Sequence, residues 1–168
     1  MIRSIHLALL AVSFAFLTPF VEARDLVPFS SNGVAQLLAQ PVPGGTVAAV
    51  DSGRATLLGN FTSVYDLHVS LAGAYLVFDG TFTSTASSGG TITFDVHVAV
   101  SLLTGGFAGE FSAIGGTARF KGISGGRVTT WGVANLSYGT FDYTAKGFLP
   151  SIGSAKQDDS SSESAETR

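Results

Sequence analysis

The residues TITFDVHVAV, positions 91–100, alternate apolar and polar side chains over most of their length. One face would carry Ile92, Phe94, Val96, Val98 and Val100, and the other Thr91, Thr93, Asp95 and His97. Because successive side chains leave opposite sides of a strand, this period of two predicts an antiparallel strand with one buried face and one solvated face. An all-β fold follows as the first expectation.

Similar short runs, separated by turns that contain glycine, continue from residue 54 to residue 149. We predict about eight strands: Arg54–Thr62, Val64–Leu71, Tyr75–Ser84, Thr91–Val100, Phe107–Ile114, Ala118–Gly122, Arg127–Leu136 and Thr140–Phe148. Glycine pairs in the gaps allow the positive φ of tight turns, so most connections have the length of a hairpin loop. Such connections make sequence neighbours antiparallel partners, which predicts a meander.

An open meander leaves two exposed edges, and soluble proteins usually remove them by closing a barrel or packing two sheets. Five glycines fall inside the predicted strands: Gly59, Gly80, Gly109, Gly132 and Gly147. Interior glycine permits the sharp coiling that barrel corners need. We therefore predict an eight-stranded closed antiparallel barrel over residues 54–149, with an immunoglobulin-like sandwich as the alternative.

The first 23 residues have the three regions of a secretory signal peptide. Arg3 precedes an apolar run over residues 7–17, and Val21-Glu22-Ala23 supplies the small residues of a cleavage site. The alternative, a membrane anchor, needs roughly 20 apolar residues, and this run is interrupted too early. We expect cleavage after Ala23, no transmembrane anchor after processing, and a secreted or periplasmic location.

The two flanks of the barrel lack strand periodicity. Residues 24–53 contain three prolines and the Gly44-Gly45 pair, so we expect an irregular lead-in. Residues 150–168 are serine-rich and acidic, a composition that buries too little apolar surface to offset the entropy of ordering, so we expect a disordered tail.

Composition excludes several kinds of function. The chain has no cysteine, which removes disulfides and thiolate metal sites. Its net charge is −3, and the one local basic cluster, Arg119, Lys121 and Arg127, is too small for a phosphate-binding stripe. We therefore expect no nucleic-acid partner.

Residues 115–122, GGTARFKG, resemble the GGTGRF-type turn and strand of the allene oxide cyclase and dirigent group of barrels, with Ala118 at the position of a glycine. Residues 128–136 and 139–141 continue the resemblance. It implies a calycin-like eight-stranded barrel with a hydrophobic cavity. It also implies, as one alternative, a cofactor-independent cyclase or a dirigent-like stereochemical guide.

Two Asp-x-His pairs are the polar candidates for a site: Asp66 with His68, and Asp95 with His97. Each pair places a carboxylate and an imidazole on one strand face, as acid–base catalysis or weak metal binding requires. The competing interpretation is that this face is the solvent face of the barrel. No paired-histidine motif is present, so we expect no metal and no cofactor.

Aromatic residues on the predicted apolar faces are the candidates for lining a lumen: Tyr65, Phe78, Phe94, Phe111 and Tyr143. An eight-stranded barrel is either filled by side chains or holds one small ligand. Trp131 alternates with both polar and apolar residues, so the sequence does not decide whether its side chain lies on the inner or the outer face of the strand.

These observations favour a non-enzymatic role. We expect a binding protein for a hydrophobic small molecule, or a structural module of the cell envelope or extracellular space. A second copy of the chain is a further candidate partner, because the outer faces of such barrels can associate.

Overall fold

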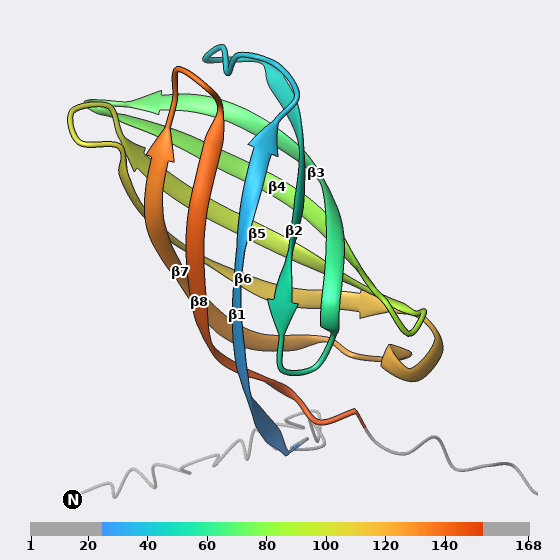
Figure 1. The fold of residues 1–168 in the computed structure, drawn as a ribbon. Helices are drawn as coiled ribbons and strands as arrows, with labels where there is room; N and C mark the ends of the chain where they lie inside the picture. The colour runs from blue at the N-terminus through green and yellow to red at the C-terminus, as the bar shows by residue number, and fades with distance from the viewer. Residues whose placement is uncertain (1–24, 153–168) are drawn as a thin grey trace, which may run out of the picture.

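The computed structural model describes residues 25–152, and in this part of the chain eight strands close into one antiparallel barrel in chain order (Figure 1). The elements are β1 (Leu26–Leu37), β2 (Thr46–Ala55), β3 (Gly59–Ala72), β4 (Tyr75–Ala86), β5 (Thr91–Ser101), β6 (Gly106–Gly116), the 3₁₀ helix η1 (Ala118–Phe120), β7 (Gly125–Asn135) and β8 (Thr140–Pro150). The predicted closed barrel is confirmed, and the sandwich alternative is wrong. The predicted signal peptide lies outside the described residues, as does nearly all of the predicted tail.

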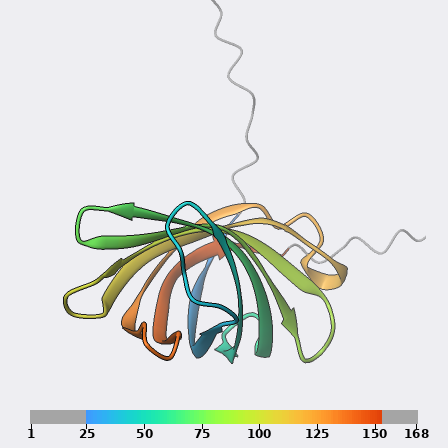
Figure 2. The same ribbon diagram turned by 90° about the horizontal axis from the view of Figure 1, so that it is seen from above.

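Closure depends on the pairing of β1 with β8, which runs from Leu26↔Pro150 to Gln36↔Thr140. Strands on opposite walls of the barrel cross at a large angle in two perpendicular views (Figures 1 and 2). Such tilt is what closure of a sheet requires. Among the described residues, no helix is long and apolar enough to cross a membrane.

The expected irregular lead-in is wrong, because residues 26–37 and 46–55 form β1 and β2. Pro28 does not prevent this: β1 pairs with β2 only from Ser31 onward, so at Pro28 the strand has a partner on the β8 side alone. Proline is tolerated where one edge of a strand needs no N–H donor. The barrel therefore spans residues 26–150 rather than 54–149.

Two of the predicted strands are also wrong. The first, Arg54–Thr62, contains the turn between β2 and β3, where Gly59 has a φ of +69°. The other, Ala118–Gly122, contains η1, whose Phe120 is fully buried. Ala118 has a φ of +51°, the left-handed conformation that favours glycine. The expected number of strands was right only because these errors balance the two missed strands.

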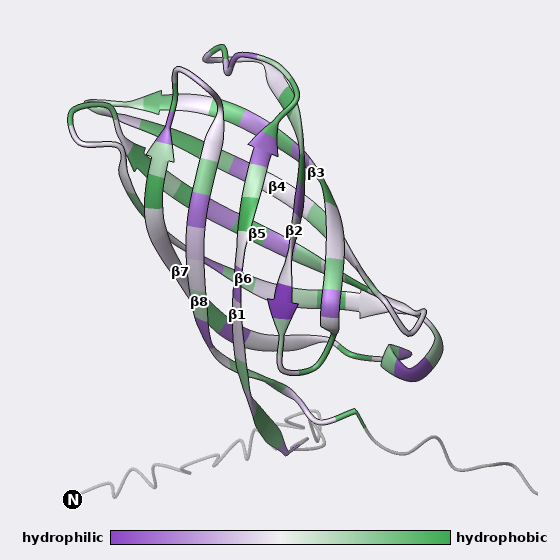
Figure 3. Cartoon of the chain, in the orientation of Figure 1, coloured by the Kyte–Doolittle hydropathy of each residue, from purple (hydrophilic) through white to green (hydrophobic). Residues whose placement is uncertain are grey.

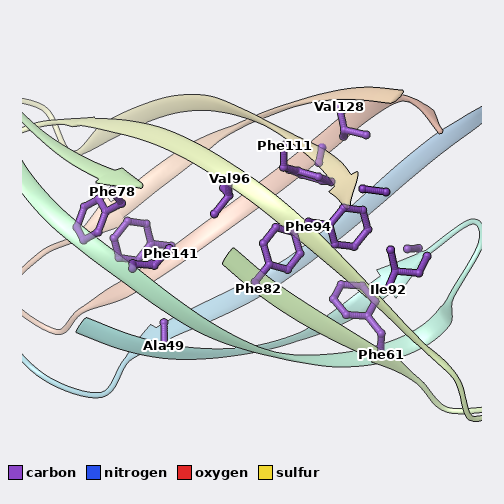
Figure 4. Close-up of a cluster of buried hydrophobic side chains, with 14 of the residues drawn as sticks. Ala49, Phe61, Phe78, Phe82, Ile92, Phe94, Val96, Phe111, Val128 and Phe141 are labelled. Atoms are coloured by element: carbon purple, nitrogen blue, oxygen red, sulfur yellow. The ribbon is translucent and has the colours of Figure 1, made fainter. Parts of the chain in front are cut away.

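The core occupies the barrel interior and follows the predicted alternation. On β5, Ile92 and Phe94 are buried inside, whereas Asp95 and His97 are exposed outside. Figure 3 shows the same change of hydrophilic and hydrophobic residues along the strands. Figure 4 shows aromatic side chains from several strands meeting in the interior.

Some of the interior glycines allow neighbouring strands to approach closely. A Cβ atom at Gly80 would lie 2.1 Å from the backbone oxygen of Asp66, and one at Gly132 would lie 1.9 Å from that of Asp142. Because the obstructing atoms belong to the backbone, a side chain could not move them aside. Glycine is therefore required at these points of the wall.

Candidate functional site

A cavity of about 90 Å³ lies inside the barrel. Aromatic rings form much of its wall, among them Phe29, Phe61, Phe82, Phe94, Phe107 and Phe111. Their arrangement follows from the strand register, which places residues of neighbouring strands side by side on the inner face. The lumen is thus largely filled, with a small apolar space left between the rings.

The central part of this wall is a row of stacked rings. Tyr65 on β3, Phe82 on β4 and Phe94 on β5 are direct cross-strand partners. The ring centroids of Tyr65 and Phe82 lie 4.7 Å apart, as do those of Phe82 and Phe94, and both pairs are stacked. The ring of Phe111 meets Phe94 edge-on at 5.2 Å (Figure 4). Such ring pairs stabilise the wall beyond the burial of their apolar surface.

Four of the five aromatic candidates line this cavity: Tyr65, Phe94, Phe111 and Tyr143. Phe78 does not. Phe78 is buried, and its ring packs edge-on against that of Phe141, with 5.9 Å between the ring centroids (Figure 4). Phe141 belongs to the cavity wall and Phe78 does not.

A carboxylate that the sequence analysis did not single out lies beside the cavity. Asp51 on β2 faces the interior and is only 6% exposed. The hydroxyl groups of Tyr65 and Tyr143 both donate to its Oδ2 atom, each at 2.7 Å. We call Asp51, Tyr65 and Tyr143 the Asp–Tyr cluster.

The cluster depends on the closure of the barrel. Tyr143 on β8 reaches Asp51 on β2 across β1, and its partner on β1 is Gly33. A Cβ atom at Gly33 would lie 2.9 Å from the Tyr143 hydroxyl oxygen. The absence of a side chain at Gly33 therefore leaves room for the phenol over the strand.

Both tyrosines hold their protons firmly. Burial raises the pKa of Tyr65 well above its usual value, and the negative charge of Asp51 raises it further, against a smaller opposing effect of the Ser63 hydroxyl. Burial and Asp51 likewise raise the pKa of Tyr143. Since an ionised phenol beside the carboxylate would be a buried like-charge pair, both hydroxyls act as donors.

The other oxygen of Asp51 has no such partner. Oδ1 is buried and accepts no hydrogen bond from any described residue. The ion pairs among the described residues, His97 with Asp79 and Arg127 with Glu110, lie on the outer surface. Asp51 is therefore a buried carboxylate whose charge no described cation balances, an arrangement that structural carboxylates rarely show.

Further hydroxyl groups lie on the inner face. Ser63 and Ser84 share a buried hydrogen bond of 2.7 Å. Thr130 donates to the backbone oxygen of Thr144, and Ser31 and Ser84 contribute to the cavity wall. The lumen thus combines aromatic rings with a few polar groups, as small-molecule sites commonly do.

The Asp-x-His candidates lie elsewhere. Asp66, His68, Asp95 and His97 are all exposed on the outer face. Asp79 on β4 is the register partner of both His68 on β3 and His97 on β5, and it pairs with Nδ1 of His97. The two Asp-x-His pairs are therefore separated by strand β4. Within residues 25–152, no group of three or more acidic or histidine side chains could hold a metal ion. Trp131 is also on the outside and is 42% exposed.

Asp51 was missed because the sequence around it hides the period of two. Val47, Ala49 and Asp51 face inward, but the outward Ala48 and Val50 are apolar as well. An apolar run broken by one aspartate reads as irregular beside the nearby prolines and glycines. The one available signal was the aspartate itself, two residues after Ala49 on the inner face.

Fold and site together define a small closed antiparallel barrel with an aromatic lumen and a buried carboxylate. Comparison with known proteins adds no family to this description: no protein-family model matches the chain, and no curated protein is significantly similar to it.

Proposed function

We propose that this protein binds a small, mostly apolar molecule inside its barrel. The observation that carries the proposal is the cavity of about 90 Å³, which is lined mostly by aromatic residues and also by serine and tyrosine residues. A cavity of 150 Å³ accommodates benzene, so the smaller space here suits a slender, flexible molecule such as a short alkyl chain. Long-chain lipids would need a rearranged core.

A matched pair of substitutions tests this proposal. Val96→Phe adds a ring to the cavity wall, whereas Val64→Phe makes the same change at a side chain that is 63% exposed. The probe is 1-butanol, titrated while NMR follows the methyl groups of Val96 and Val98 in the parent and those of Val98 in Val96→Phe. Saturable shifts are expected in the parent and in Val64→Phe and should be lost in Val96→Phe.

Native mass spectrometry of the purified chain, followed by denaturing extraction, would identify any molecule that the barrel carries from its host. A defined small molecule near one per barrel supports the proposal. Absence of a co-purified molecule together with no 1-butanol binding would refute it and favour a filled barrel with a structural role.

A second candidate function is a cofactor-independent cyclase or a dirigent-like stereochemical guide. The Asp–Tyr cluster favours it, because a buried carboxylate and two phenols could steer a flexible substrate in an apolar space. The resemblance of residues 115–122 to that group of barrels points the same way. Conversion of an extracted ligand to an isomer, lost in Asp51→Asn, would support catalysis; unchanged recovery of the ligand would support binding alone.

The site of action that we propose is outside the cytoplasm. This rests on the composition of residues 1–23, whose charged start, apolar run and small-residue end have the order of a signal peptide.

A further inference from the structure

We propose that the ligand of the lumen carries a protonated amine, which binds at the Asp–Tyr cluster. This inference rests on the proposed function, since it names the chemistry of the molecule that the barrel would hold. It follows from three properties of the cluster: its hydrogen-bonding capacity, its charge and its aromatic surroundings.

The cluster has acceptors to offer and no free donors. The hydroxyl protons of Tyr65 and Tyr143 are both used on Oδ2 of Asp51. A phenol that has donated its one proton can only accept, and a carboxylate oxygen can only accept. Oδ1 of Asp51 has no partner among the described residues. A ligand group that meets the cluster must therefore be a donor.

The charge of the cluster selects among donors. Asp51 is 6% exposed, and no cation among the described residues pairs with it. A buried charge without a partner is costly, so a cationic ligand would relieve a cost that a neutral one leaves in place. A primary ammonium has three donors, no acceptor and a positive charge. An anionic ligand would instead meet a buried negative charge.

The aromatic wall favours the same ligand. The ring of Tyr65, whose hydroxyl is bound to Asp51, is stacked on Phe82, and Phe82 is stacked on Phe94. Stacking covers the faces of Phe82, so the rings at the two ends of the row, Tyr65 and Phe94, are those whose faces can attract a cation, and a desolvated site strengthens this attraction. A carboxylate beside aromatic rings is thus complementary to an alkylammonium ion, with the charge at Asp51 and the alkyl chain among the phenylalanines.

The geometry indicates how the ligand would sit. Tyr65 and Tyr143 belong to the cavity wall, whereas Asp51, to which both hydroxyl groups donate, does not. An ammonium group that approaches the cluster from the cavity therefore meets the two tyrosines before the carboxylate. Because Oδ1 of Asp51 is buried, contact with it requires a neighbouring side chain to move aside. The volume of about 90 Å³ limits the rest of the ligand to a short chain.

Three probes of similar size test the inference on the full chain at neutral pH: n-butylamine, 1-butanol and butyrate. We expect butylamine to bind about tenfold or more tightly than 1-butanol. Hydrogen bonds between charged groups contribute more free energy than those between neutral groups, and the difference is large enough for a tenfold change in affinity. Butyrate should bind more weakly than either. Asp51→Asn should abolish the preference for the amine, and the control Asp66→Asn, on the outer face, should retain it.

The outcomes separate the two proposals. Binding of 1-butanol with no preference for butylamine would overturn the amine inference and leave the proposed function standing. If no probe binds, both are overturned. Should Asp51→Asn fail to fold, the order of the three affinities in the unchanged chain still decides. An amine preference that persists in a folded Asp51→Asn variant would place the amine at another site.

Discussion

Tyr143→Phe removes one of the two hydroxyl groups that donate to Asp51 and keeps the ring. The lost hydrogen bond is 2.7 Å long and joins a phenol to a buried carboxylate. Hydrogen bonds to charged groups contribute about 1.5–3 kcal/mol, so we expect the free energy of unfolding to fall by that amount. With a urea m-value of about 1–3 kcal/mol/M for a small protein, the midpoint should drop by roughly 1 M.

Urea unfolding followed by circular dichroism measures this change. The matched control is Tyr138→Phe, because the Tyr138 side chain is 76% exposed. It should leave the midpoint nearly unchanged. In a double-mutant cycle, Tyr143→Phe should cost much less in the Asp51→Ala background, because alanine has no acceptor for the Tyr143 hydroxyl. A loss below about 0.5 kcal/mol in the parent, equal to that of the control, would refute the reasoning.

Four further predictions follow from the structure and the sequence. Above about pH 10 the unfolded chain loses tyrosine protons that folded Tyr65 and Tyr143 keep, so the free energy of unfolding should fall by up to about 1.4 kcal/mol per pH unit for each tyrosine. In Tyr143→Phe the contribution of Tyr143 to this fall should be missing. A free energy of unfolding that does not change with pH in this range would contradict the raised pKa values. In urea unfolding, Gly80→Ala should destabilise the fold by about 1–3 kcal/mol, because the new Cβ atom would meet the backbone of the neighbouring strand. The control Gly115→Ala, at a position with open space and no positive φ, should change stability by less than about 1 kcal/mol. Equal effects of the two substitutions would argue against a close approach of the strands at Gly80. Ala118→Gly should add up to about 1 kcal/mol to the free energy of unfolding, because it relieves a left-handed alanine, and should therefore raise the thermal midpoint; the same change at exposed Ala108 on β6 should lower the midpoint. Intact-mass analysis of the exported protein should find a chain beginning at Arg24, and a mature form beginning at Met1 would exclude cleavage.

The sequence predicted correctly those strands whose two faces differ. On β5, polar Thr93 and Asp95 alternate with apolar Phe94 and Val96, and the structure has the same inner and outer faces. Prediction failed on β1 and β2, where Ser31, Gly33 and Asp51 interrupt the apolar residues of the inner face. Alternation is a signal only when burial and polarity agree, and in these strands they do not.

The aromatic part of the site was also accessible from sequence, because a large apolar side chain on an inward face must meet the lumen. The Asp-x-His pairs lie on the outer face, as the competing interpretation of the sequence held. The pairs at Asp66 and Asp95 stand out in the sequence since they interrupt apolar strands, yet that interruption is what an outer face produces.

Local alternation, glycine turns and the absence of cysteine thus sufficed to establish an all-β meander without disulfides, because these features depend on neighbours in the chain. The Asp–Tyr cluster was decided by tertiary structure alone. Tyr65 lies 14 residues from Asp51 in the chain, and Tyr143 lies 92 residues from it. Tyr143 reaches Asp51 only because β8 closes on β1 and Gly33 leaves room for its side chain to cross that strand. Ring closure brings the ends of the chain together, and no local pattern records which inward side chains then come within hydrogen-bonding distance.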